Sequence, residues 1–354
     1  MACQGYCIFE WLTILLVLVA VPVYLLFLGM LIKFRNKNEF KAPFYQFIIW
    51  CGVADLWWIV HYYSLGKFPD WGWFLNLYRW GGGDLARYYL TLNWYLRAAQ
   101  AMGVLLMSLN RFTAIVWPAM HETWWTPARV RRAIALQWLI PISTVAHMFF
   151  VCDFYYFERK NGTSLQGSSG KCPPNCQCRK VTWGLNTGFL FLVVSLLVAM
   201  YLVMFVSYRS HKNKVLPKPG PQGGLTAQEV ARQRRKIRTQ IKLAVNGFVI
   251  ALTLVSFGVF YGFKTVFPEF ATYYPKLNGV LSSILFLNYS LINPFVCIAL
   301  NSKVRQFFII TLKLIVGVQV NQVEVDKMAA STSRAPSVAG HVQLNFQKRV
   351  TNQN

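Results

Sequence analysis

Charged residues are scarce in this sequence. Only 14% of the 354 residues are charged, and Asp and Glu together number 12. Soluble domains carry about 25% charged residues, so the composition excludes an ordinary soluble protein. Hydrophobic residues make up 55% of the chain, aromatic residues 16%, and the mean hydropathy is +0.36. These values are typical of an integral membrane protein.

Enzyme and metal-site motifs are also missing. The five histidines are scattered without the spacing of metal ligands, and no Walker or dinucleotide glycine motif occurs. We therefore expect no enzyme activity, no resident cofactor and no metal site. The net charge of +24 would suggest nucleic acid in a soluble protein, but neither a soluble domain nor a nucleic-acid motif is present. Because the basic residues lie beside apolar runs, we expect them to bind anionic inner-leaflet lipid.

Seven apolar runs are long enough to cross a bilayer, which takes roughly 20 residues in a helix. A membrane barrel would show shorter segments of alternating polarity instead. Helices satisfy their own backbone hydrogen bonds in lipid, so the fold class predicted is an all-α membrane protein, a seven-transmembrane helix bundle. The runs are Trp11–Ile32, Phe44–Leu65, Tyr89–Val116, Ala133–Cys152, Trp183–Tyr208, Leu243–Phe263 and Leu277–Leu300.

The distribution of Lys and Arg predicts the orientation in the plasma membrane. The loops after the first, third and fifth runs and the tail hold most of these residues, which places them in the cytoplasm and the amino terminus outside. We expect an extracellular segment at 1–10, the bundle at 11–300, a short cytoplasmic amphipathic helix at 301–316 and a disordered cytoplasmic tail at 317–354. The first run lacks the basic region and cleavage site of a secretory signal, so we expect it to be retained.

The longest extracellular loop predicts covalent modification. Asn161-Gly-Thr163 is a glycosylation sequon in a polar stretch, on the side that the charges place outside. Asn288-Tyr-Ser290 matches the same pattern but lies inside the last run, so we discard it. Six cysteines fall on the oxidising side and predict disulfides, with fifteen pairings open. A zinc site is the weaker alternative, because the loop has no histidine. The six are Cys3, Cys7, Cys152, Cys172, Cys176 and Cys178.

Three charged residues lie within or at the end of apolar runs. Asp55 is either a hydrogen-bonded or protonated carboxyl, or an ion- or proton-linked switch. Arg97 and Arg111 are fourteen positions apart, which leaves them about 40° apart around one helix, so both are expected to face the bundle together. Arg97 then either binds an anionic ligand, pairs with an internal acid or extends to the headgroups. By depth and polarity, the predicted pocket residues are Asn93, Trp94, Arg97, Gln100, Tyr261 and Ser282.

The third cytoplasmic loop is strongly basic. Thr226-Ala-Gln-Glu229 fits a capping box, and Glu229 to Lys242 is predicted to be a helix that continues into the sixth run. This helix is either a solvated, lipid-facing segment or a docking surface for a cytoplasmic protein.

Several short motifs in this sequence resemble those of a known protein family. Asp55 within Ala54-Asp55-Leu56, Asn110-Arg111-Phe112, Trp138 and Asn293-Pro294 together resemble a rhodopsin-type G-protein-coupled receptor. The run from Ser108 to Pro118 resembles, more narrowly, the nematode serpentine receptors of class gamma. The resemblance implies that Arg111 reaches into the G-protein cavity, that Asp55 and Asn293 form a polar cluster, and that Pro294 kinks the last helix.

The chain also departs from the receptor pattern. Asn110 stands in place of the usual acid, and the start of the sixth helix, Arg234 to Arg238, has no acid either. The third helix has no cysteine at its outer end. These differences imply that the usual ionic contact cannot hold the inactive state.

The function predicted is a chemosensory receptor that couples an extracellular small molecule to a heterotrimeric G protein. Arg97 alone suggests that this molecule is anionic. A transporter or ligand-gated channel is the alternative, although the runs show no inverted repeat. A non-signalling structural protein is the third hypothesis, disfavoured by Asp55, Arg97 and Arg111.

Overall fold

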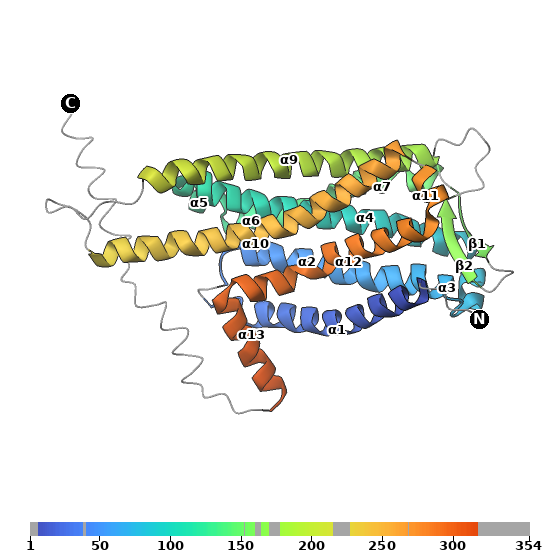
Figure 1. Ribbon diagram of the computed structural model, residues 1–354, viewed down its shortest axis with the longest axis horizontal. Helices are drawn as coiled ribbons and strands as arrows, with labels where there is room; N and C mark the ends of the chain where they lie inside the picture. Colours follow the sequence, from blue (N-terminus) through green and yellow to red (C-terminus); the bar gives the residue numbers. More distant parts are fainter. Residues whose placement is uncertain are drawn as a thin grey trace.

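The computed structural model describes residues 6–37, 40–151, 153–159, 164–169, 178–214, 227–267 and 269–317. Long helices run side by side along one axis (Figure 1). The helical elements are α1 (Tyr6–Lys33), α2 (Pro43–His61), η1 (Tyr62–Lys67), α3 (Phe68–Asp70), α4 (Leu75–Val116), α5 (Pro118–Trp124), α6 (Pro127–Leu139), α7 (Ile142–Val145), α8 (Met148–Val151), α9 (Cys178–Lys214), α10 (Ala227–Val266), α11 (Glu269–Tyr273), α12 (Pro275–Leu300) and α13 (Ser302–Ile315). The strands β1 (Phe154–Arg159) and β2 (Ser164–Ser169) form a hairpin.

Six helices in the described ranges are long and apolar enough to cross a membrane. Many of their large side chains point outward, including Trp11 (64% exposed) on α1 and Phe191 (70% exposed) on α9. Apolar surface of this extent suits contact with lipid chains. The helical bundle expected from the sequence is confirmed.

The fourth run is not one continuous helix, which corrects the expectation for Ala133–Cys152. α6 ends at Leu139, and the short helices α7 and α8 follow. Pro141 is the physical reason, because it has no N–H with which to continue the ladder of helical hydrogen bonds. The Ser143 and Thr144 hydroxyls donate to the Ile140 and Pro141 carbonyls, each at 2.8 Å. Side chains thus supply hydrogen bonds to backbone carbonyls at the break.

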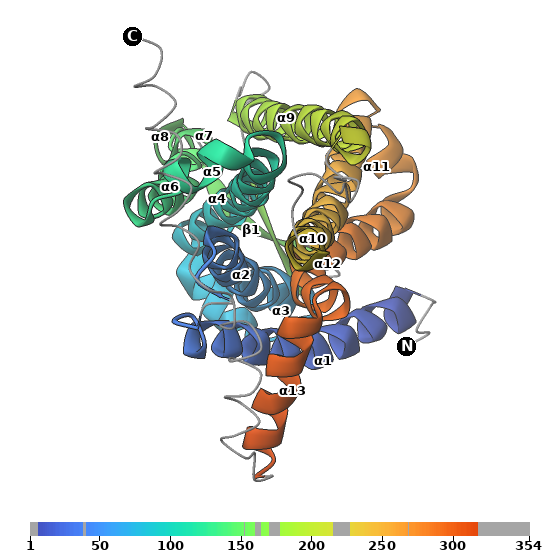
Figure 2. The ribbon, with the colours of Figure 1, turned by 90° about the vertical axis from the view of Figure 1, so that its left-hand side faces the viewer.

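α4 occupies the middle of the bundle and is longer than its apolar run. It packs against α2, α6, α9 and α10, as the end-on view shows (Figure 2). It begins at Leu75, so the stretch before Tyr89 is largely helical rather than a loop. At Gly82 the backbone has φ 48° and ψ −134°, a conformation that glycine adopts readily. The glycine tract therefore breaks the regular geometry inside α4.

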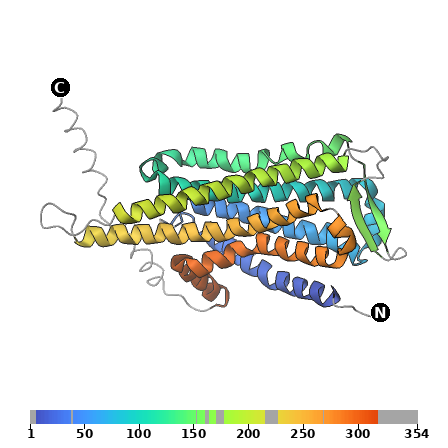
Figure 3. The same cartoon turned by 45° about the horizontal axis from the view of Figure 1, so that its top comes forward.

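The hairpin lies at one end of the bundle and α13 at the other (Figures 1 and 3). We call these the hairpin end and the α13 end. The sequence predicted only a polar loop around the sequon, so the two strands are a new finding. Asn161, Cys3, Cys152, Cys172 and Cys176 lie outside the described residues. Cys7 and Cys178 lie in α1 and α9, but their side chains are not described.

The hairpin is attached to α4 by close contacts. A Cβ on Gly83 would lie 2.6 Å from the Phe154 carbonyl oxygen, so the strand approaches the helix where no side chain intervenes. The Arg87 guanidinium lies 5.9 Å from the Phe154 ring centroid. Arg79 and Glu158 form an ion pair at 3.0 Å. These contacts hold the hairpin without a cysteine on α4.

The apolar runs predicted at 11–32, 183–208, 243–263 and 277–300 lie within α1, α9, α10 and α12. α10 runs without interruption from Ala227 to Val266, so the basic segment of the third loop and the sixth run form one helix. α1 continues through Pro22, and α12 continues through Pro294. α13 begins at the Asn301 side chain, which accepts hydrogen bonds from Lys303 N at 3.0 Å and Val304 N at 3.4 Å.

α13 turns away from the bundle axis and is attached by aromatic contacts (Figure 1). Phe307 lies between Phe34, at 4.8 Å between ring centroids, and Phe40, at 5.1 Å. Val304, Phe307, Phe308 and Ile310 are buried, while Arg305 is exposed. The exposed residues are mixed, since Arg305 and Lys313 lie beside exposed Ile309 and Leu312, a composition that suits the membrane interface.

Candidate functional site

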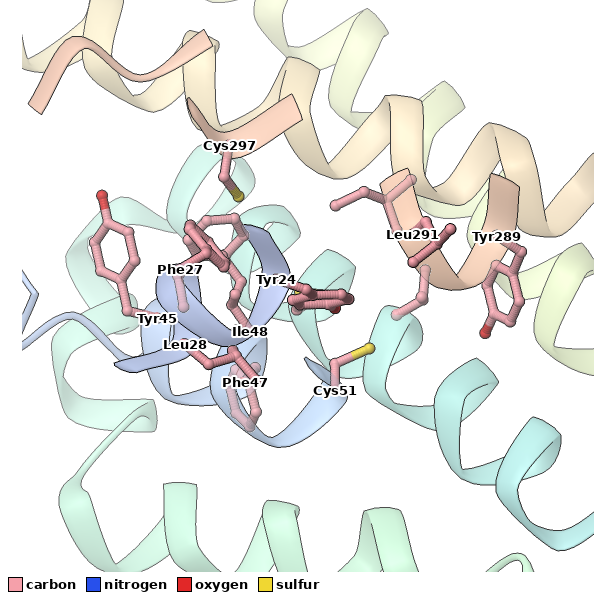
Figure 4. Close-up of a cluster of buried hydrophobic side chains, with 14 of the residues drawn as sticks. Tyr24, Phe27, Leu28, Tyr45, Phe47, Ile48, Cys51, Tyr289, Leu291 and Cys297 are labelled. Carbon is pink, nitrogen blue, oxygen red and sulfur yellow. The ribbon is translucent and has the colours of Figure 1, made fainter. Parts of the chain in front are cut away.

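A buried polar cluster lies in the middle of the bundle, centred on Asp55. The Asp55 side chain is 1% exposed and accepts from three other helices. Gln100 Nε2 donates to Oδ1 at 2.8 Å, Asn293 Nδ2 donates to Oδ2 at 3.0 Å, and the Tyr24 hydroxyl also donates to Oδ2. Figure 4 shows Tyr24 and Cys51 close together between α1 and α2. The polar cluster therefore joins α1, α2, α4 and α12.

Gln100 has a different place from the one predicted. Besides Asp55 it contacts the Ser290 hydroxyl on α12 at 3.1 Å, so it belongs to the polar cluster rather than to a ligand pocket. Sequence reasoning missed Ser290 and Tyr24 altogether. Ser290 precedes Asn293 by three positions on a helix, a spacing that places both on one face and could have found it.

A cavity lies among α4, α9, α10 and α12, between the polar cluster and the hairpin end. The space here that protein atoms do not fill is about 400 Å³, a figure that includes solvent outside the cavity. The predicted pocket residues Trp94, Arg97 and Tyr261 line it. Asn93 does not, because its side chain accepts from Trp58 Nε1 at 2.9 Å, and half-buried Ser282 is not in the lining either. Sequence reasoning missed the other lining residues, which are Ala98, Ala101, Asn186, Thr187, Phe189, Leu190, Leu254, Phe257 and Tyr289.

Arg97 is the cation that lines this cavity. Its Nη1 donates to the Tyr261 hydroxyl at 2.9 Å, and its guanidinium lies 3.8 Å from the Phe286 ring centroid and 5.2 Å from that of Trp94. Among the described residues no acidic side chain forms an ion pair with Arg97. Aromatic faces stabilise the charge through cation–π contacts but do not neutralise it, so the cavity keeps a positive potential.

Arg111 lies at the α13 end of α4 and, like Arg97, faces the interior. It is 3% exposed, and its guanidinium lies 4.0 Å from the Phe44 ring centroid. Its neighbour Asn110 is fully buried, and neither side-chain nitrogen nor oxygen has a hydrogen-bond partner. Phe112 packs edge-on against Trp117 at 5.3 Å.

α5 is attached to this end of α4 through Thr113. The Thr113 hydroxyl contacts His121 Nδ1 at 3.0 Å and accepts from Trp125 Nε1 at 2.8 Å. Burial, together with the nearby charge of Arg111, lowers the pKa of His121. The imidazole is therefore neutral at physiological pH, and the α4–α5 contact does not require its charge.

Uncharged contacts hold α10 against its neighbours near Arg111. Asn246 Nδ2 donates to Cys297 Sγ on α12 at 3.0 Å, and Asn246 is 2% exposed. On the other side, a Cβ on Gly247 would lie 2.8 Å from the Tyr201 hydroxyl, which itself contacts Ser108 on α4 at 3.2 Å. We call this set of contacts the α10 latch. The latch begins eight residues after Arg238, so it lies further along α10 than the stretch in which the sequence lacks an acid.

Metal binding has no support within the part of the chain that the structure describes. There, no three His, Cys, Asp or Glu side chains come together in a group able to hold a metal ion.

Comparison with known proteins identifies the family of this chain. Residues 13–314 match the family described as "Serpentine type 7TM GPCR chemoreceptor Srv". Serpentine receptor class V-1 of Caenorhabditis elegans is 26% identical over 307 residues, which cover 84% of this chain and 88% of the relative.

Muscarinic acetylcholine receptors are more distant relatives. The M5 receptor of Mus musculus is 22% identical over 218 residues, and the human M1 receptor is 26% identical over 198 residues. These matches cover 60% and 55% of this chain but only 38% and 40% of the relatives.

Proposed function

Because the chain belongs to the Srv family of serpentine seven-transmembrane chemoreceptors, we propose that its cavity beside Arg97 binds the ligand and that the surface beside Arg111 binds the heterotrimeric G protein. The protein is a G-protein-coupled chemosensory receptor and not an enzyme. The expectation of class gamma was wrong, since both the family match and the nematode relative are class V. The Ser108–Pro118 run that suggested class gamma is short compared with the match over 13–314.

The arrangement of polar residues along α4 carries this proposal. Arg97 lines the cavity, Gln100 contacts Asp55 one turn later, and Arg111 lies at the α13 end. On α12, Tyr289 lines the same cavity and its neighbour Ser290 contacts Gln100. A ligand that shifts α4 against α12 therefore acts directly on the polar cluster, and through it on the helix that carries Arg111.

The positive charge of Arg97 in the cavity restricts the charge of the ligand. The muscarinic relatives are named for acetylcholine, a quaternary ammonium compound. The same ligand would be repelled by Arg97 in a cavity of low dielectric constant. We propose that the ligand of this chain is anionic.

We propose that the hairpin end faces outward in the plasma membrane and the α13 end faces the cytoplasm. The basic residues of α13 and those of α10 that precede Leu243 then lie at the inner leaflet, where anionic lipid attracts them.

Glycosylation of Asn161 tests this orientation. In a eukaryotic host, N-glycosidase is expected to increase the gel mobility of the wild-type chain and leave Asn161→Gln unchanged, because only lumenal sequons are modified. Asn288→Gln serves as the control and is expected to keep the wild-type shift, since Asn288 lies within α12. A wild-type chain without a shift contradicts the orientation.

The α10 latch tests coupling to the G protein. Replacing Asn246 with alanine removes the hydrogen bond to Cys297, which is worth about 0.5–1.5 kcal/mol. If movement of α10 exposes the G-protein site, ligand-independent nucleotide exchange rises about threefold to tenfold. The measurement uses the purified chain in lipid discs with a panel of heterotrimeric G proteins.

Thr253→Val is the matched control on the same helix. The Thr253 hydroxyl donates to the Ile250 carbonyl within α10, so its loss removes no contact between helices. Equal basal exchange in wild type and Asn246→Ala, with every G protein of the panel, would contradict the role of the latch.

A further inference from the structure

Three residues that line the cavity each hold a buried polar atom with no hydrogen-bond partner. They are Arg97 Nε on α4, Thr187 Oγ1 on α9 and Tyr289 Oη on α12. Tyr289 is 3% exposed, so bulk water does not reach its hydroxyl. Unsatisfied buried polar groups are rare in folded proteins and costly, and each calls for an explanation. A molecule bound in the cavity provides one.

The three atoms define the chemistry that would satisfy them. Arg97 Nε–H is only a donor, and the Tyr289 and Thr187 hydroxyls each have a proton to donate. The complement is therefore a group rich in acceptors. A carboxylate has two oxygens with about four acceptor positions, and its hydrogen bonds to a guanidinium are charge-assisted.

The other lining residues indicate which kind of body the ligand has apart from its polar group. Ala98, Leu190, Leu254 and Phe257 present carbon atoms to the cavity. Phe257 also stacks on Tyr289, with ring centroids 6.0 Å apart and an interplanar angle of 6°. Such walls favour a compact apolar or aromatic body, with the polar group at one side.

From these contacts we infer that the cavity binds a small monocarboxylate with an aromatic or branched apolar body, whose oxygens accept from Arg97, Tyr289 and Thr187. This inference rests on the proposed ligand role of the cavity and adds the chemical class and two contacts, on α9 and α12. A cationic amine would be repelled by the positive charge of Arg97. A neutral amide would offer one acceptor oxygen and bury donors of its own.

The experiment uses the full chain in lipid discs with three probe carboxylates: benzoate, phenylacetate and 3-phenylpropionate. Their primary amides and benzylamine are the controls of matching shape. The thermal midpoint is followed with a thiol-reactive dye, because Cys51 and Cys297 are buried and become reactive on unfolding. At least one carboxylate is expected to raise the midpoint in a saturable manner, and its amide and benzylamine are not.

Two substitutions test the proposed contacts with the carboxylate directly. Arg97→Gln is expected to weaken carboxylate binding by about 10- to 100-fold, and Tyr289→Phe by about fivefold. Without ligand, Tyr289→Phe is expected to raise the midpoint, because it removes a buried hydroxyl that has no partner. Higher stability with weaker binding is an outcome that a purely structural tyrosine would not produce.

Tyr95→Phe is the matched control on α4. The Tyr95 hydroxyl donates to the Trp138 carbonyl at 2.9 Å, away from the cavity. This variant is expected to bind the carboxylate as wild type does. The inference is wrong if no carboxylate raises the midpoint more than its amide, or if Tyr289→Phe binds as tightly as wild type.

The ligand class and the proposed function can fail separately. Tissue-extract fractions that stimulate nucleotide exchange equally in wild type and Arg97→Gln would overturn the carboxylate and leave the receptor function standing. A carboxylate that binds but never stimulates exchange would support the site and count against its signalling role.

Discussion

Replacing Asp55 with alanine is expected to destabilise the receptor strongly. The change removes the acceptor shared by Tyr24, Gln100 and Asn293, so three buried donors from three helices each lose a hydrogen bond, although Gln100 keeps its contact with Ser290. Each hydrogen bond lost by a buried donor costs about 1–3 kcal/mol. With that loss, the thermal midpoint is expected to fall by about 5–10 °C.

The thiol-reactive dye measures this directly, because Cys51 lies 3.8 Å from Asn293 Nδ2 at the edge of the cluster. Asp55→Asn is the graded control, since it keeps one acceptor oxygen and nearly the same shape. Its midpoint is expected to lie between those of wild type and Asp55→Ala. If Asp55→Ala unfolds at the wild-type temperature, the polar cluster does not hold the four helices together.

Replacing Arg111 with alanine is expected to lower ligand-stimulated nucleotide exchange by about 100-fold. Arg111 is buried at the α13 end of α4, and we expect movement of α10 to expose it to the G protein, where an arginine at the centre of an interface is often worth about 2–4 kcal/mol. The fold is expected to persist, because Arg111 is not part of the polar cluster that joins α1, α2, α4 and α12. The measurement is exchange at matched receptor concentration, with the thermal midpoint recorded in parallel.

Arg87→Ala is the control for Arg111→Ala. Arg87 lies on the same helix and contacts an aromatic ring more loosely, 5.9 Å from the Phe154 centroid, at the hairpin end. Its exchange rate is expected to stay near that of wild type. Arg111→Ala with wild-type exchange would place the G-protein contact elsewhere.

Apolar run length predicted the bundle well because lipid leaves few alternatives to a helix. It failed for the fourth run, where hydropathy continues through Pro141 but the helical hydrogen bonds do not. It also missed the hairpin at Phe154–Ser169. Strand pairing depends on contacts between segments, here the close approach of Phe154 to Gly83, which no local pattern reveals.

The candidate site was predictable where one helix determined it. The spacing of Arg97 and Arg111 along α4 is enough to predict that both side chains face the interior of the bundle. The division between pocket and polar cluster was not predictable, because Gln100 lies one turn from Arg97 and only the position of α12 assigns it to Asp55. Thr187 and Tyr289 carry no sequence signal, since their role depends on three helices that meet at one cavity.

The most direct test of the receptor mechanism measures ligand binding and nucleotide exchange on the same disc preparations of wild type, Arg97→Gln and Arg111→Ala. If the cavity binds the ligand and Arg111 contacts the G protein, Arg97→Gln loses binding and, with it, exchange. Arg111→Ala then binds as wild type does and fails to stimulate exchange. Normal exchange by Arg111→Ala, or a ligand-dependent ion flux through the discs that neither substitution changes, would contradict this mechanism.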